Sequence, residues 1–536
     1  MPAIVYQTNK STGITYAYES VSYWDKKKQQ SRAKRKCIGK VDPETNEIVP
    51  TRKQKAKNSG TEGKKKPGPA ATIDSARYFY GATYLLDQIG EELGINADLK
   101  KCFPGRHLQI RSIAYFLVLE DNNPLMRFPK WAALHKHPFG EDIPSQRSSE
   151  LFASIAAEER EQFFGLQGKR RLEDEYWAYD ITTISSYSKC LKQVKRGYNK
   201  EHDLLPQFNL ALVFGELSNL PFYYRKLPGN IPDVKTINNL LADMDFLSLK
   251  KVKLVMDRGF YSEENINKLF QYRYKFLIAP RVNLNYVKAR IESLREEMKT
   301  WSNYNQQYEL YASSSTITWQ YSQKRPYKKD EIKGERRMYL HLYYNSEKAT
   351  EDERRQNILL SSLQQELTDG NRIADHEHLY SRYFETTSTP VRGVKVKAKQ
   401  ELIDEAKKNY GYFALISNDV KDPIKALEIY RNKDLAEKAF GNLKERLNFR
   451  RALVSSEQSL DGKLFVEFIA LIYLSYIKKK MQEKELFKKH TMQGLLDQFD
   501  VIECFEQPGR SLRIGEMTKK QIELYDAIDV TQPSLQ

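Results

Sequence analysis

Apolar and polar residues alternate in three different ways along the chain, and each pattern predicts a different kind of element. From Thr72 to about 170, apolar residues recur at spacings of three and four, which is typical of helices that pack on one face. Over 171–281, short apolar and β-branched runs predict buried strands, with one helix inserted at 229–244. Over 282–401, one charged helix is followed by alternating, strand-like runs in a very polar background.

The last part of the chain returns to long apolar elements. A buried strand is predicted at 408–418, a helix at 429–447, and further helices from about 456 onward. The most apolar run, 465–477, is shorter than the roughly 20 residues of a membrane span and contains Glu467. It therefore predicts a core helix.

These changes of pattern divide the chain into six regions. Three are helical or basic, two form the two parts of one α/β core, and one interrupts that core. The predicted regions are a basic strand-rich start with a linker (1–70), a helical DNA-binding domain (71–170), the first part of the core (171–281), a strand-rich insertion (282–401), the second part of the core (402–480) and a C-terminal helical region (481–536).

The helix predicted at 429–447 carries an unusual polar stripe. At about 100° per residue, Tyr430, Lys433, Glu437 and Lys444 share an arc of roughly 60° beside the apolar face. A plain amphipathic helix needs only an apolar face and a solvated face. A phenol, a carboxylate and two amines beside the buried face would suit an acidic metal site that handles a phosphodiester. Taken alone, the stripe is more simply explained as the solvated edge of an ordinary helix.

Two aspartates far upstream change the interpretation of this stripe. Asp180 and Asp257 each follow a buried apolar run, so each is predicted at or just past the end of a strand. Because an unpaired charge in such a place is costly, these carboxylates need partners. For Asp257 the alternative is a cap of the following helix, although Ser262 has the sequence context of a helix start of its own.

Charge and composition add a class of partner. The net charge of +17 and the pI of about 9.2 favour a polyanion, and the 40% hydrophobic content is that of a soluble globular protein. The segment from Asp25 to Lys66 contains fifteen Lys or Arg residues but only five Asp or Glu residues, and Tyr23 and Trp24 shortly precede three consecutive lysines. This region is either a nucleic-acid-binding arm or a solvated tail.

The four cysteines are too scattered for a zinc knuckle or a disulfide framework, so they predict reduced thiols in a cytosolic protein.

Without Cys or His nearby, Asp180, Asp257 and Glu437 would form a hard-oxygen site, which favours two Mg²⁺ ions, with Mn²⁺ as a substitute. Two such ions stabilise both oxygens of an in-line phosphoryl displacement. Lys433 and Lys444 could then hold phosphates, and Tyr430 could donate a hydrogen bond to the DNA backbone.

With these motifs in place, the chain resembles the DDE-type insertion-sequence transposases whose glutamate helix has a Y-(2)-R-(3)-E-(6)-K signature. Tyr430, Lys433, Glu437 and Lys444 match that spacing, with lysine in place of arginine. The segments YDITT and DRGFYS resemble the first and second aspartate motifs of the group. The resemblance covers about 1–480.

The resemblance implies an α/β fold with a ribonuclease-H-like core, a mixed sheet flanked by helices, and Asp180, Asp257 and Glu437 as catalytic metal ligands. It implies a prokaryotic, cytoplasmic and nucleoid-associated enzyme without membrane contact. Its partners would be double-stranded DNA, both terminal inverted repeats and target, held by a homodimer in a synaptic complex. The ends would be nicked, often through a DNA hairpin, before the freed 3′-hydroxyl attacks target DNA.

The resemblance also implies DNA contacts by Arg258 and the stacking of a flipped base on an aromatic residue of the insertion. Trp319 is the candidate, with Trp301 behind it, whereas a tryptophan alternating in a strand is otherwise a core residue. Lysine at 433 keeps the charge but loses the bidentate fork of arginine, so weaker phosphate positioning is expected.

Three other functions remain open at this stage. A nuclease of the same fold would cut without strand transfer. A DNA-binding descendant of a transposase would have lost an acidic residue, whereas all three are present. An RNA-binding protein should carry a recognisable RNA module, and none is found.

Overall fold

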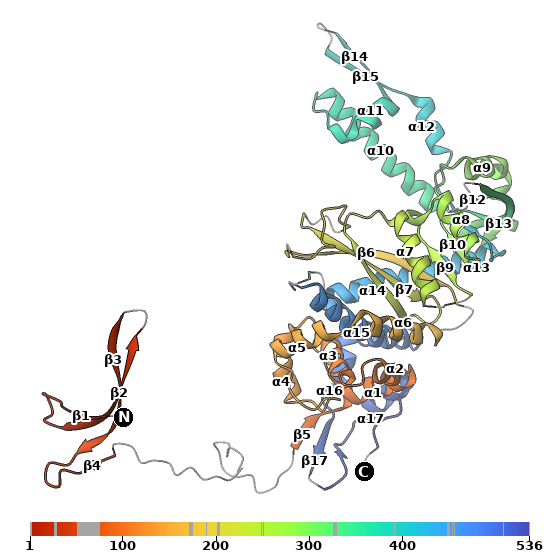
Figure 1. The fold of residues 1–536 in the computed structure, drawn as a ribbon. Coiled ribbons are helices and arrows are strands. Elements are labelled where there is room, and N and C mark those ends of the chain that lie inside the picture. Colours follow the sequence, from red (N-terminus) through yellow and green to blue (C-terminus); the bar gives the residue numbers. More distant parts are fainter. Residues whose placement is uncertain are drawn as a thin grey trace. The chain divides into compact units, whose positions relative to one another are not determined.

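The structure is a computed structural model. It describes residues 3–534 apart from 26–28, 51–75, 171–174, 189, 201–203, 248, 250, 325–329, 390–392, 448–450, 453, 455 and 508. For residues 246, 388, 389, 393 and 435–437 it describes the backbone alone. The chain forms two compact units, 1–73 and 74–536, which are taken one at a time (Figure 1).

The first unit is an antiparallel sheet in the order β1-β2-β3-β4. Among its described residues only Ala17 and Gly39 are buried. A Cβ on Gly39 would lie 2.5 Å from the carbonyl oxygen of Val49, so glycine allows β4 to approach. The strands are β1 (Ala3–Thr8), β2 (Thr15–Asp25), β3 (Gln30–Val41) and β4 (Ile48–Val49). The lysines at 26–28 and the predicted linker lie outside the described residues.

The second unit is built on a mixed sheet of nine strands in the order β11-β12-β13-β16-β10-β9-β6-β7-β8. Its centre is parallel, because β9 pairs in parallel with both β6 and β10, and its flanks are antiparallel. The central strands are β6 (Trp177–Ser185), β7 (Gln207–Gly215), β8 (Pro221–Pro228), β9 (Lys253–Met256), β10 (Lys275–Ile278) and β16 (Tyr412–Ser417). The mixed α/β architecture predicted from the apolar runs is thus present.

Two helices make the crossovers into the parallel strands. The helix α7 (Asp233–Phe246) connects β8 to β9, and α8 (Glu263–Gln271) connects β9 to β10. Ser262 caps α8 by accepting a hydrogen bond from the backbone N–H of Asn265 at 3.1 Å. The cap of that helix is therefore Ser262, which removes the capping alternative for Asp257.

The segment between β10 and β16 contains helices as well as strands. Its strands β12 (Leu310–Lys324) and β13 (Glu331–Tyr344) join the main sheet beside β16. The part that follows β13 has a small core of its own around Leu363, Tyr380 and Phe384. The remaining elements are α9 (Asn285–Met298), η3 (Trp301–Asn303), β11 (Tyr304–Asn305), α10 (Ser346–Thr368), η4 (Ala374–His376), α11 (Glu377–Tyr383), β14 (Phe384–Thr389), β15 (Gly393–Ala398) and α12 (Gln400–Lys407).

The helix predicted at 429–447 is three successive segments, which corrects the expectation of one regular helix. They are α13 (Pro423–Asn432), α14 (Asp434–Gly441) and a π-helical turn, η5 (Asn442–Arg446). Lys433 lies at the junction of α13 and α14 with right-handed backbone angles. Because a π-turn adds a residue to the helical repeat, Lys444 no longer has the angular position that a regular helix would give it.

The rest of the unit is a helical body around the 27-residue helix α15 (Glu457–Glu483), which packs against α3, α5 and β8. Residues 465–477 of α15 are all buried, which confirms the predicted core helix. Among the described residues, no helix has the length and hydrophobicity that crossing a bilayer requires. The other elements are β5 (Ala76–Phe79), α1 (Gly81–Glu92), α2 (Ile95–Cys102), α3 (His107–Leu119), η1 (Leu125–Arg127), α4 (Phe128–Ala132), α5 (Ser145–Ser154), α6 (Ala157–Lys169), η2 (Arg258–Phe260), η6 (Leu486–Lys488), α16 (Met492–Asp500), β17 (Glu503–Glu506), β18 (Arg513–Ile514) and α17 (Lys519–Ala527).

Candidate active site

The pairing of β6 with β9 brings two of the predicted carboxylates side by side. Tyr179 pairs with Met256 at the last position of this parallel ladder, so Asp180 within β6 and Asp257 just past the end of β9 each follow the last paired residue. Neighbouring strands lie about 4.8 Å apart. The two residues are 77 positions apart in the sequence (257−180), and only the crossover through β7, β8 and α7 makes them neighbours.

The two aspartates differ in their local setting. Asp257 directly follows β9 and precedes η2, as predicted. Asp180 lies within β6 rather than at its end, because β6 runs on to Ser185 in pairing with β7. Asp180 is half-buried, and its Oδ1 accepts the backbone N–H of Ile181 at 2.7 Å. The parallel ladder ends at Tyr179, one residue before Asp180, whereas the strand continues.

The side chain of Tyr430, on α13, contacts Asp257. Its hydroxyl donates to Asp257 Oδ1 at 2.5 Å, across 173 residues of sequence. Burial raises the pKa of Asp257, but the Tyr430 hydrogen bond and the Lys433 and Arg258 charges outweigh it, so the pKa lies below its usual value. Burial and the adjacent carboxylate raise the pKa of Tyr430. Asp257 is thus held as a carboxylate by a neutral phenol.

Lys433 belongs to the same cluster. It is 7% exposed, although it is a lysine at the junction of two helices, and its Nζ lies 5.2 Å from the centre of the Tyr430 ring. A buried ammonium needs negative charge nearby. The charge of Lys433 lowers the pKa of Asp257, so this buried lysine lies near enough to that carboxylate to act on it.

The third predicted carboxylate belongs to a helix beside the other two. Glu437 lies on α14, which packs against both β6 and β7. Its side chain lies outside the part of the chain that the structure describes, so its approach to Asp180 and Asp257 stays a prediction.

The remaining predicted site residues differ in how exposed they are and in what they contact. Arg258 is exposed next to Asp257, and Lys444 is half-buried in η5. Trp319 in β12 is half-buried, donates its indole N–H to Asn267 Oδ1 at 2.8 Å and packs edge-on against Tyr286. Trp301 is 82% exposed and stacks on Tyr304. Base stacking by Trp319 stays a prediction, with Trp301 more open to a ligand.

Two further charged residues lie beside the aspartates and were not predicted as site residues. Lys200 donates its ammonium to the carbonyl oxygen of Ile181 at 2.6 Å and pairs with Asp233 at 3.2 Å. A Cβ built on Gly259 would lie 3.7 Å from Asp233 Oδ2, which places the start of α7 beside the Asp257 turn. The position of Asp233 at a helix start was visible in the sequence, whereas Lys200 stands in a loop without a motif.

The donor set fits a hard divalent cation. Asp180 and Asp257 offer carboxylate oxygens where the β6–β9 ladder ends, without Cys or His, as Mg²⁺ and Mn²⁺ prefer. Among the side chains that the structure describes, no three His, Cys, Asp or Glu residues gather closely enough to hold an ion. The Glu437 side chain is outside that set, so two of the three predicted ligands can be placed.

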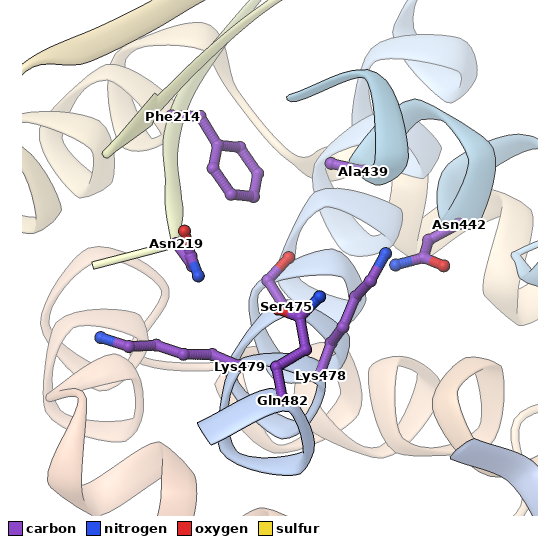
Figure 2. Close-up of a pocket in the computed structure, with 8 residues that line it drawn as sticks. All are labelled: Phe214, Asn219, Ala439, Asn442, Ser475, Lys478, Lys479 and Gln482. Carbon is purple, nitrogen blue, oxygen red and sulfur yellow. The ribbon is translucent and has the colours of Figure 1, made fainter. Parts of the chain in front are cut away.

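A separate cationic hollow lies where β7, α14, η5 and α15 meet (Figure 2). Burial, followed by repulsion from Lys438, lowers the pKa of Lys478, which reaches toward Asn442 in Figure 2. The hollow contains none of the three predicted carboxylates. Its lining residues are Phe214, Asn219, Ala439, Asn442, Ser475, Lys478, Lys479 and Gln482.

The family model described as "Transposase DDE domain" matches residues 173–473, which contain all of the residues discussed for the acidic site. Among solved structures, the cryo-EM structure of a piggyBac transposase synaptic complex with hairpin DNA is similar at 10% identity and a TM-score of 0.35, covering 85% of this chain and 83% of that one. No curated protein matches the chain.

Proposed function

Since the chain belongs to the transposase DDE-domain family, we propose that it is a metal-dependent DNA transposase that cuts transposon ends and joins the freed 3′-hydroxyls to target DNA. The observation that carries this proposal is that Asp180 and Asp257 each follow the last paired residues, Tyr179 and Met256, of two adjacent parallel strands. From the segment that also bears Glu437, Tyr430 donates a hydrogen bond to Asp257 and the charge of Lys433 lowers the pKa of that carboxyl.

The sheet supports a ribonuclease-H-like core. In its central part, β8-β7-β6-β9-β10, three antiparallel strands are followed by two strands that continue in parallel. In chain order, Asp180 lies on the first strand of this part, β6, and Asp257 follows the fourth, β9. The elements between β10 and β16 would then be the insertion that interrupts the core.

Each residue has a separate task in this proposal. Asp180, Asp257 and Glu437 would hold two Mg²⁺ ions, and such ions stabilise the attacking and leaving oxygens of a phosphoryl displacement. Tyr430 orients Asp257 and keeps it ionised. Lys433 stabilises that carboxylate and, with Arg258 and Lys444, provides positive charge for the DNA backbone.

A homodimer that bridges two transposon ends follows from the reaction rather than from a contact. Joining both ends of one element to a target requires two active sites in one complex. A hairpin intermediate would need an aromatic residue to stack the flipped base, for which Trp319 and the more exposed Trp301 are the candidates.

The alternative is a nuclease-only or non-catalytic DNA-binding descendant of a transposase. The presence of all three acidic residues favours the active enzyme over the non-catalytic one. Strand transfer distinguishes the transposase from the nuclease.

The test is cleavage of a plasmid that carries the gene for this chain with its flanking DNA on both sides. We expect nicks at the element boundaries with Mg²⁺ or Mn²⁺ and none with EDTA, followed by insertion into a second plasmid. Binding without cleavage under either ion would favour the DNA-binding descendant, and cleavage without insertion would favour the nuclease.

Tyr430→Phe is expected to lower cleavage by about 10–100-fold while the protein stays folded. Removing the hydroxyl leaves Asp257 without the hydrogen bond that orients it, and outer-shell partners of metal ligands typically have effects of that size. The measurement is single-turnover cleavage at saturating Mg²⁺.

Tyr308→Phe is the matched control for this variant. It removes another tyrosine–carboxylate hydrogen bond, from Tyr308 to Glu428 at 3.1 Å, that does not touch Asp257. Equal rates for the Tyr430 and Tyr308 variants would show that the phenol does not act on the site.

A further inference from the structure

The outer half of the β2–β3 hairpin projects without a third strand. The strand β1 pairs with β2 as far as Ser20, and β4 pairs with Lys40 and Val41 of β3. Residues 21–25 and 30–34 therefore pair only with one another among the described residues. We name these two stretches the ribbon.

The ribbon exposes large apolar side chains that a folded protein usually covers. Val21, Tyr23 and Trp24 are 51%, 48% and 62% exposed. A two-stranded hairpin in water is marginally stable by itself, so such a surface is typical of one that meets a partner.

One face of the ribbon combines two of these apolar side chains with cations. Tyr23 lies opposite Arg32, and Val21 lies opposite Lys34, whereas Trp24 is on the other face. Just beyond the ribbon, Lys36 continues the same face of β3, opposite Glu19 of β2, and alternate residues stand roughly 7 Å apart. The twelve residues of β3 include five cationic residues and no acidic one. Asp25 is the acidic residue of the ribbon, and it lies 3.9 Å from Arg32.

The shape and charge of this face fit duplex DNA. The major groove of B-DNA is about 12 Å wide and admits a two-stranded β-ribbon, and its rims are lined with phosphates. The major groove of A-form RNA is deep and too narrow for such an element. An apolar contact from Val21 or Tyr23 could reach base edges or thymine methyl groups while the cations meet phosphates.

We propose that the β2–β3 ribbon is a DNA-binding element that enters the major groove with the face formed by Val21, Tyr23, Arg32 and Lys34, which Lys36 continues beyond the ribbon. This inference rests on the proposed function, because it takes DNA as the substrate. It adds a DNA contact in the first unit, distinct from the residues of the acidic site.

The test measures the affinity of the full chain for a fluorescent DNA duplex as a function of salt. The variant Arg32→Thr, Lys34→Thr, Lys36→Thr removes three cations and keeps good strand formers. Since each phosphate contact contributes about 0.9 to the slope of log K against log salt, we expect the slope to fall by roughly 2–3. Lys34→Arg with Lys36→Arg should preserve the wild-type slope.

Two further variants separate charge from apolar contact. Tyr23→Thr should weaken binding with the slope unchanged. Lys488→Gln, Lys519→Gln, Lys520→Gln removes the same charge from exposed positions outside the first unit and should leave affinity and slope as in wild type. A triple ribbon variant that behaves like this control would overturn the inference.

The outcomes for the ribbon and for the proposed function are distinguishable. If wild type binds DNA and the ribbon variant binds with the same slope, the ribbon inference fails while the transposase proposal stands. If wild type does not bind DNA at all, the proposed function fails. If duplex RNA of the same sequence competes as well as DNA, the ribbon is an RNA-binding element instead and the proposal is overturned.

Discussion

Alanine at Asp180, Asp257 or Glu437 is expected to reduce DNA cleavage by more than about 100-fold in each single variant. The reason is that each carboxylate would bind metal directly, whereas loss of an outer-shell partner already costs 10–100-fold. Asp180 and Asp257 adjoin one another through the β6–β9 pairing, so losing either would leave an incomplete ligand set. The measurement is the initial rate of end cleavage with Mg²⁺ and, separately, with Mn²⁺.

The double variant Asp180→Ala, Asp257→Ala should be little worse than either single variant. Residues that act as one unit are strongly non-additive, because the first substitution already removes what the second would disrupt. Additive losses would instead indicate two independent contributions, such as separate DNA contacts.

Asp434→Ala is the matched control for the acidic residues. Asp434 is exposed at the start of α14, three residues before Glu437, so its removal changes the same charge on the same helix. We expect wild-type cleavage from this variant. If Glu437→Ala cut as well as Asp434→Ala, Glu437 would not be the third ligand.

Local sequence pattern was sufficient to predict the elements that carry the site. The apolar runs before Asp180 and Asp257 are the buried strands β6 and β9, and the predicted helix start at Ser262 is a capped helix. Buried strands and helix caps can be predicted in this way because each is determined by residues that are close together in the sequence.

Pairing between distant strands could not be predicted in the same way. The register that sets Asp180 beside Asp257 depends on a crossover of more than seventy residues, and Lys200 reaches Ile181 from a loop without any motif. The junction at Lys433 was also missed, since the helical periodicity of the sequence continues across it. The helix segments on either side of this junction make tertiary contacts, such as the Tyr430–Asp257 hydrogen bond, which the periodicity of the sequence does not reveal.

The highly charged α10 illustrates a different limit. Its 23 residues include Leu363 and Leu367 as the buried positions, so the apolar stripe is too narrow to stand out from a polar background. Their partners, Tyr380, Phe384 and Ile403, follow later in the chain. A small core assembled from scattered residues leaves a weak periodic signal in any one of them.

Glu467→Met is expected to stabilise the protein, and the gain should grow as the pH rises. Glu467 is 1% exposed in the middle of α15, and neither carboxylate oxygen has a hydrogen-bond partner among the described residues. Lys463 lies 3.6 Å away, beyond hydrogen-bond range. Burial raises the pKa of Glu467 to about 8, against the opposing charge of Lys463. Glu467 in turn acts on Tyr224 of β8, whose pKa is also influenced by Arg160 of α6 and Asp461 of α15.

The direction of the pH effect follows from the raised pKa. In the unfolded chain Glu467 ionises near pH 4.3, whereas in the folded chain it stays protonated until about pH 8. The folded state is therefore penalised progressively between these values, by up to about 1.4 kcal/mol for each pH unit. Methionine has a similar volume without a charge, and replacing a buried ionic group by an apolar one can gain about 1–4 kcal/mol.

The measurement is the difference in unfolding midpoint between Glu467→Met and wild type at several pH values from 5 to 8. The control is Glu483→Gln, which removes a carboxylate from the 45% exposed end of the same helix and should change stability by less than about 0.5 kcal/mol at every pH. A difference that stays flat with pH would mean that Glu467 is ionised in the folded protein at pH 5, with Lys463 as an effective partner. Because α15 packs against β8 as well as against α3 and α5, a rising difference would identify this carboxylate as a destabilising group where the nine-stranded sheet meets the helical body.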